Sequence, residues 1–84
     1  MAELKIRKQP ANRPGMTEIR ITGFKDGELD ELKSMEHGEA SEKLIEMLDY
    51  RNGNQGTCWA QGYGIYGVWF DNEAAYLNIG SSCD

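Results

Sequence analysis

The stretch that decides the fold is Thr57–Ile79, which reads TCWAQGYGIYGVWFDNEAAYLNI. It holds both tryptophans, three of the four tyrosines and one of the two phenylalanines of the chain. Aromatic and β-branched residues favour strands, while glycine and Asn-rich clusters mark the turns between them. The segment therefore predicts a three-stranded antiparallel β-meander, with strands near residues 57–61, 65–70 and 74–79.

A two-residue turn after Asp71 would set the register of the last two strands. One face would then pair Phe70 with Ala75, Val68 with Leu77, and Tyr66 with Ile79, and the other face would pair Trp69 with Tyr76. We expect Trp59 and Ile65 to join this second face. Two interpretations of it stay open, because it is either exposed as a contact site or covered by the N-terminal arm or by residues 26–40.

The stronger helix pattern runs from Ser41 to Arg51, with Ser41 as the N-cap and Gly53 as the C′ residue. Its apolar residues fall within one arc of about 160° at about 100° per residue, and its acids fall opposite. The apolar set is Leu44, Ile45, Met47 and Leu48, and the acidic set is Glu42, Glu46 and Asp49. One face is expected in the core and the other as an anionic stripe.

Two weaker patterns precede this helix. The alternation in Glu18–Thr22 predicts a strand whose Ile19 and Ile21 face the core. Three-residue spacing of apolar side chains in Glu28–Met35 predicts a short helix or 3₁₀ segment. The fold class is therefore α+β: a strand near 17–23, one or two helices across 28–51, and a three-stranded meander packed on the second helix. The expected core is Ile19, Ile21, Leu44, Ile45, Leu48, Val68, Phe70, Leu77 and Ile79.

Eighty-four residues make one small domain with a thin core. Residues 1–15 contain two prolines and many basic or amide side chains, so they predict an extended or flexible basic arm, with the globular domain covering residues 16–84. The chain has neither a signal-peptide pattern nor an apolar run of membrane-spanning length, so the expected compartment is the cytoplasm. Cys58 and Cys83 are expected as reduced thiols, and a disulfide between them is the alternative.

The net charge of −5 is unevenly distributed. Residues 1–20 carry five basic against two acidic side chains, and residues 25–49 carry nine acids against three lysines. Nucleic-acid affinity comes mainly from Lys and Arg contacts with phosphates, so direct nucleic-acid binding is not expected of this acidic body. A protein partner with a basic surface fits the charge better.

The hexapeptide Gln55–Ala60 resembles the segment around the nucleophilic cysteine of papain-like proteases, in which a Cys-Trp-Ala run opens a long helix. The resemblance would make Cys58 a nucleophile. In that family the catalytic His and the orienting Asn lie far downstream, whereas the single histidine here, His37, lies upstream. The glycines after Ala60 also cannot continue a helix, so thiol catalysis is not expected.

Other patterns also fall short of a catalytic or cofactor site. His37 has no second histidine to converge with, and we interpret it as a surface residue. The acids of residues 26–31 lack the spacing of a calcium loop, and the glycines Gly62, Gly64 and Gly67 match a dinucleotide fingerprint with no helix after it. No enzyme, metal or cofactor is expected.

The leading hypothesis is a non-enzymatic interaction protein that docks on the basic, nucleic-acid-binding surface of another protein. Phages and mobile elements use small acidic proteins as inhibitors of host nucleic-acid machinery, and an anti-CRISPR-like inhibitor of a defence nuclease complex, acting in the host cytoplasm, is one such interpretation. Alternatives are a homo-oligomer, for example a homodimer, that pairs through its aromatic sheet face, and a small-ligand-binding domain. The candidate partner-binding residues are Glu39, Glu42, Glu46, Asp49, Trp59, Tyr63, Trp69 and Tyr76.

Overall fold

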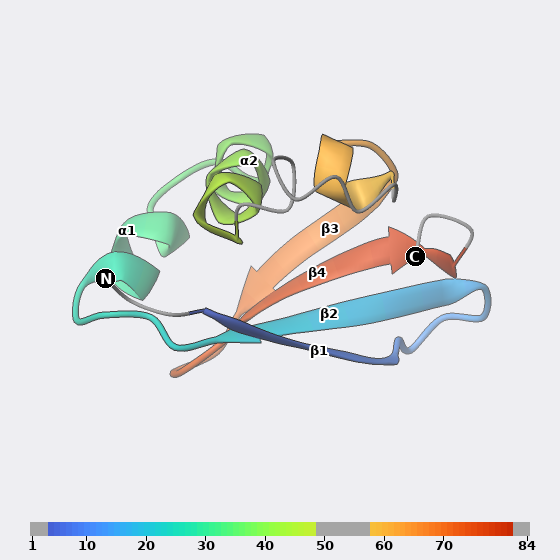
Figure 1. The fold of residues 1–84 in the computed structure, drawn as a ribbon, viewed down its shortest axis with the longest axis horizontal. Coiled ribbons are helices and arrows are strands. Elements are labelled where there is room, and N and C mark those ends of the chain that lie inside the picture. Colours follow the sequence, from blue (N-terminus) through green and yellow to red (C-terminus); the bar gives the residue numbers. More distant parts are fainter. Residues whose placement is uncertain (1–3, 49–57, 82–84) are drawn as a thin grey trace.

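The computed structural model describes residues 4–48 and 58–81 as one sheet with helices on one side (Figure 1). Along the chain the elements are β1 (Lys5–Pro10), β2 (Met16–Thr22), α1 (Glu28–Lys33), α2 (His37–Leu48), the 3₁₀ helix η1 (Trp59–Gln61), β3 (Ile65–Phe70) and β4 (Ala75–Gly80). The α+β class predicted from sequence is confirmed. The strand order is β1-β2-β4-β3, with every neighbouring pair antiparallel.

The predicted three-stranded meander is wrong in its first strand. Residues 59–61 form η1, and Gly62 ends it in the left-handed region at φ 95°. The carbonyl of Cys58 accepts hydrogen bonds from the backbone amides of Gln61 and Tyr63, so the chain turns tightly here. A tight turn that buries Trp59 at 2% exposure satisfies the backbone locally and fills the core, which a third hairpin strand would leave open. The neighbour of β4 on its other side is β2 instead.

The β3–β4 hairpin follows most of the predicted register. Phe70 pairs with Ala75, Val68 with Leu77, and Trp69 with Tyr76. The predicted pair of Tyr66 with Ile79 is wrong, because Ile65 takes that place and the register shifts between Ile65 and Gly67. This bulge leaves Tyr66 outside the alternation at 73% exposure.

The helices follow the predicted pattern with different ends. The segment near 28–35 forms α1, and its Leu29 and Leu32 are buried. The second helix begins at His37 rather than after Ser41, so Ser41 is not its N-cap, and the Ser41 hydroxyl donates to the carbonyl of Gly38 within the helix. The earlier start adds Ala40 to the buried face of α2. The predicted C-terminal end, from Asp49 to Gly53, lies outside the described residues.

The basic arm contributes the edge strand β1, which pairs with β2 along its whole length from Lys5 opposite Thr22 to Pro10 opposite Thr17. Gly15, at φ 77°, allows the reversal between the two strands. The carbonyl of Gly15 also accepts a hydrogen bond from the amide of Ser81, which ties this turn to the end of β4.

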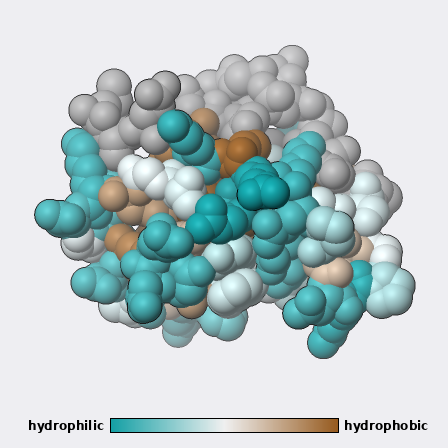
Figure 2. All heavy atoms as spheres, turned by 90° about the horizontal axis from the view of Figure 1, so that it is seen from below, coloured by the Kyte–Doolittle hydropathy of each residue, from teal (hydrophilic) through white to brown (hydrophobic). Residues whose placement is uncertain are grey.

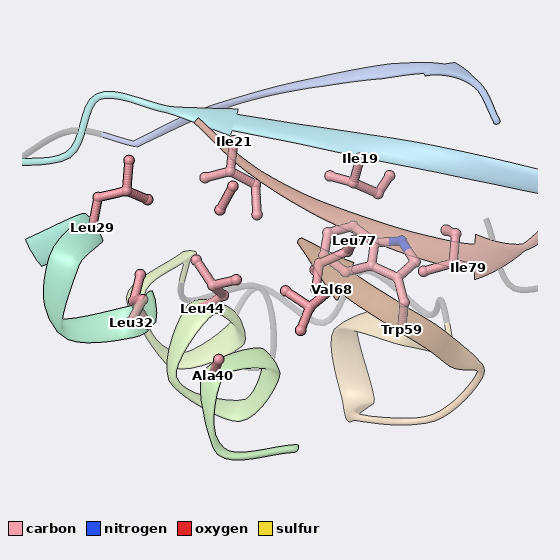
Figure 3. Close-up of a cluster of buried hydrophobic side chains, with 11 residues drawn as sticks. Ile19, Ile21, Leu29, Leu32, Ala40, Leu44, Trp59, Val68, Leu77 and Ile79 are labelled. Atoms are coloured by element: carbon pink, nitrogen blue, oxygen red, sulfur yellow. The ribbon is translucent and has the colours of Figure 1, made fainter. Parts of the chain in front are cut away.

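The core lies between the sheet and the helices (Figure 3). Ile19 and Ile21 of β2 and the facing residues of β4 meet Leu29 and Leu32 of α1 and Leu44 of α2. Trp59 reaches in from η1 toward Leu77 and Ile79, so it belongs to this core and not to the outer sheet face where it was expected. Of the core predicted from sequence, Leu48 and Phe70 are only half-buried.

Candidate interaction surfaces

The carboxylates expected on α2 lie on its solvent side. Glu39, Glu42 and Glu46 are exposed, while Leu44 and Ile45 of the same helix are fully buried. None of the three glutamates forms an ion pair with another residue of 4–48 or 58–81. We call these three residues the α2 carboxylate face. Asp49, the fourth acid expected here, lies outside the described residues.

The side of the sheet away from the helices carries the other expected aromatic residues. Cross-strand partners share a face, so Arg7, Arg20, Tyr76 and Trp69 form one row across β1, β2, β4 and β3. We call this surface the helix-free face. Seen from this side, the molecule is mainly hydrophilic and shows only small apolar areas (Figure 2). Neither residues 4–15 of the arm nor residues 26–40 cover it as a layer, and it is not a broad apolar patch either.

Trp69 covers Tyr76 on the helix-free face. The two rings are stacked with centroids 3.8 Å apart, which leaves Tyr76 only 6% exposed and Trp69 44% exposed. The indole Nε1 donates to a carboxylate oxygen of Glu18 at 2.9 Å, and Gln9 donates to the other oxygen at 2.6 Å. These polar partners hold the indole flat on the sheet, so only one of its ring faces is open to solvent.

A hydrogen-bond network joins the edge of this stack to the β3–β4 turn. The Tyr76 hydroxyl donates to Asp71 at 2.6 Å and accepts from Arg20 at 3.3 Å, and Arg20 also pairs with Glu73. The hydrogen bond from Tyr76 lowers the pKa of Asp71, and two turn amides lower it further. The same bond raises the pKa of Tyr76, and the bond to Tyr76 raises the pKa of Arg20. Each shift favours the charge state seen at neutral pH, which indicates a structural network.

The structure does not gather the candidate residues into one site. The α2 carboxylate face lies on the solvent side of the helical layer, whereas Trp69 and Tyr76 lie on the opposite face of the sheet. Both helices lie on one side of this sheet (Figure 1). Trp59 is buried between these layers, and Tyr63, just after η1, is 69% exposed. A single flat partner surface therefore cannot contact all of these residues at once.

A groove between α2 and β3 brings together residues that the sequence did not connect. It is a surface hollow of about 200 Å³, lined by His37, Gly38, Ser41, Gly62, Ile65, Tyr66, Gly67 and Val68. Glu42 follows one turn after Gly38 and so lies on the same side of α2. Tyr66 lines this groove on the β3 side and also lines a second hollow, which it shares with Met16, Asn78 and the β1–β2 turn. The sequence did not identify Tyr66, because simple alternation predicts that it faces the core opposite Ile79. The bulge between Ile65 and Gly67 changes this and leaves Tyr66 exposed, and Gly67 is its one signal in the sequence.

The other hollows and reactive side chains bring together fewer groups that could act on one ligand. A wider hollow of about 540 Å³ lies at one end of the sheet, but its lining mixes Arg20 and Lys25 with Asp26, Asp30 and Glu73. Cys58 is a half-buried free thiol, and His37 is exposed at the start of α2. Within residues 4–48 and 58–81, no group of three or more His, Cys, Asp or Glu side chains is placed to hold a metal ion. No helix of these residues is long and apolar enough to cross a membrane.

Comparison with protein-family models, with curated proteins and with solved structures finds no match to this chain. Its surfaces therefore have to be interpreted from their own chemistry.

Proposed function

We propose that the chain is a non-enzymatic protein-binding module, and that the α2 carboxylate face docks on a basic surface of a partner protein. The observation that carries this proposal is the row of exposed carboxylates on α2, the helix that forms one wall of a groove also lined by Tyr66 of β3. Interfaces of this composition combine electrostatic attraction with aromatic anchors.

The charge of the helical layer supports a basic partner. Described residues 25–48 carry eight acids against three lysines, and no ion pair joins them to each other. Glu39, Glu42 and Glu46 follow one another at intervals of roughly 4.5 and 6 Å along the helix axis. A rigid row of unpaired negative charges accelerates association with a positive surface and makes binding sensitive to salt.

The aromatic residue proposed to contact the partner differs from those expected from the sequence. Trp69 and Tyr76 lie on the far side of the sheet, whereas Tyr66 lines the groove. Tyr63 is not a lining residue but directly follows Gly62, which is, and both tyrosines are more than two-thirds exposed. Tyrosine is enriched among the few residues that contribute most to binding at interfaces. We assign the anchoring role to Tyr66, because it belongs to the groove itself.

The partner class that fits best is a protein whose basic surface binds nucleic acid. A row of carboxylates on a rigid helix offers negative charge at regular spacing, as a phosphate backbone does, and would occupy the same surface. Within this class we favour an inhibitor of phage or mobile-element type, directed at a nuclease complex of the host.

The experiment uses competition with nucleic acid. The immobilised chain captures a partner from lysate, and a DNA duplex is then added. The duplex should displace the captured partner, and rising salt should weaken the capture. The Glu42→Lys/Glu46→Lys variant should lose the partner, while Asp30→Lys/Glu31→Lys, an equal charge change on α1, should retain it. Capture that neither the duplex nor the α2 reversal affects would overturn the proposal.

A further inference from the structure

The two edges of the sheet differ in their ability to accept another strand. The β1 edge carries Lys5, Arg7, Lys8 and Pro10, which are the residues that protect an edge against pairing. The β3 edge, Ile65–Phe70, carries neither a charged residue nor a proline. Within the described part of the chain, β3 pairs with β4 on one side and with no strand on the other. The β3 edge is therefore the open one.

The backbone of β3 has donors and acceptors that face this open edge. The amide of Asp71 donates to the carbonyl of Ala74, which makes that pair hydrogen-bonded. Since bonded and non-bonded pairs alternate in an antiparallel ladder, the Trp69 pair is bonded and the pairs of Phe70 and Val68 are not. The N–H and C=O groups of Val68 and Phe70 consequently point away from β4.

The surroundings of this edge indicate the side chains that an added strand would need. On the helix side, the groove beside β3 is lined by the small residues Gly38, Ser41 and Gly62, and the carboxylate residue Glu42 follows one helical turn after Gly38. On the other side stands Trp69, with one ring face open. Alternate residues of an added strand would meet these two environments in turn.

We propose that β3 accepts an extended, basic segment of the partner protein as a fifth strand, with its Lys or Arg side chains on the α2 side and apolar side chains beside Trp69. This inference rests on the proposed function and names how the partner is held. Main-chain hydrogen bonds to Val68 and Phe70 supply affinity, and the alternation of basic and apolar side chains supplies specificity. The bulge at Tyr66 limits the flat part of the edge, so the paired stretch is short.

A second copy of this chain fits the same edge less well. Antiparallel pairing of two β3 edges places both α2 helices on the same side of the joined sheet. The two carboxylate faces would then lie near one another, and like charges across an interface oppose association. A basic segment brings charges of the opposite sign to the same place.

The test follows amide hydrogen exchange by NMR while a probe peptide is added. The probe is an eight-residue peptide of alternating Lys and Val with blocked ends, and the control peptide has Glu in place of Lys. In the free protein, the amides of Val68 and Phe70 should exchange faster than that of Trp69. The Lys peptide should protect Val68 and Phe70, and the Glu peptide should not. Protection elsewhere, or nowhere, would overturn the inference, as would protection that appears without peptide when the protein is concentrated.

A matched pair of variants locates the contact. Tyr66→Lys and Tyr63→Lys make the same chemical change at two tyrosines of similar exposure, and only Tyr66 lies in β3. Tyr66→Lys should lower the affinity for the Lys peptide by about tenfold, and Tyr63→Lys should lower it by less than about twofold. Equal effects would contradict strand addition.

The two proposals can fail separately. If Glu42→Lys/Glu46→Lys abolishes partner capture but no peptide protects Val68 and Phe70, the docking function stands and strand addition is wrong. If the peptide protects these amides equally in the wild type and in the charge-reversed variant, strand addition stands and the role of the carboxylate face is wrong.

Discussion

The indole of Trp69 lies flat on the phenol ring of Tyr76, with the ring centroids 3.8 Å apart and the planes 6° from parallel. The two residues are direct partners across β3 and β4. The stack shields Tyr76 on a sheet face that no helix of residues 4–48 or 58–81 covers, so the aromatic pair stabilises the hairpin from outside the core. An aromatic pair of this kind was expected from sequence as a binding face, and its geometry gives it a structural role first.

Trp69→Ala should lower the free energy of unfolding by about 1–2 kcal/mol, because it removes a stacked aromatic pair and the hydrogen bond to Glu18. Chemical denaturation followed by circular dichroism measures the change. Tyr66→Ala is the matched control, since Tyr66 is exposed and should change stability by less than about 0.5 kcal/mol. Equal losses in the two variants would contradict a stabilising stack.

The Asp71 network predicts a dependence of stability on pH. The pKa of Asp71 is lowered in the folded protein, mainly by the hydrogen bond from Tyr76. The ionised carboxylate therefore contributes fully to the free energy of unfolding above the ordinary carboxyl pKa. This contribution is lost as the pH falls through the lowered pKa. Asp71→Asn should therefore be less stable than the wild type at neutral pH, and the difference should shrink in acid. Urea unfolding at a series of pH values checks this, and a constant difference would contradict it.

The same network raises the pKa of Tyr76 above its ordinary value, because the phenol donates to the Asp71 carboxylate. The stability that this hydrogen bond contributes is present below the ordinary tyrosine pKa and is lost as the pH rises through the raised pKa. NMR titration of the Tyr76 ring should give a pKa above the ordinary tyrosine value. In Asp71→Asn the pKa of Tyr76 should fall toward the ordinary tyrosine value, and an unchanged pKa would contradict the role of Asp71.

Among the residues of the described core, Trp59 should be the one whose replacement by Ala lowers the free energy of unfolding most. Trp59→Ala removes a large side chain that is 2% exposed, and such changes cost about 3–5 kcal/mol. A domain of this size has only about 5–15 kcal/mol of stability in total, so the variant should be partly or wholly unfolded at 25 °C. Trp59→Phe fills part of the space and should fold. Far-ultraviolet circular dichroism distinguishes the two, and a fully folded Trp59→Ala would contradict the core assignment.

Gly27 and Gly38 should respond in opposite directions to the same substitution. Both have open space where a Cβ atom would stand, but Gly27 has φ +87° at the start of α1, whereas Gly38 lies in α2. Gly27→Ala should cost about 1–2 kcal/mol through left-handed strain. Gly38→Ala should stabilise by up to about 1 kcal/mol through helix propensity. Thermal unfolding of the two variants compares them directly.

Local patterns in the sequence were sufficient for several elements. The alternation around Ile19 and Ile21 placed β2 with the correct face inward, and the spacing of Leu44 and Ile45 placed the buried side of α2. The turn at Asp71 was also predictable, because its side chain accepts from the amides of Glu73 and Ala74 and so closes a two-residue loop locally.

Three features depended on contacts between distant residues. The segment around Trp59 reads as a strand because of its aromatic content, yet it folds as a 3₁₀ turn, since burying that indole fills the space between helix and sheet. The start of α2 moved to His37 because Ala40 packs in the core, which overrides the capping preference of Ser41. The bulge at Tyr66 follows from pairing with β4, and its one local signal is the neighbouring Gly67.

The sequence by itself determined the α+β class, the amphipathic helix with its acidic side, and the pairing of Trp69 with Tyr76, because periodicity and turn chemistry act over a few residues. Only the tertiary structure decided that the basic arm becomes an edge strand, that the acids and the aromatic pair lie on opposite sides, and that Tyr66 borders a groove beside α2. These outcomes depend on which elements share one core and which strands become neighbours, and both are set by packing between residues far apart in the chain.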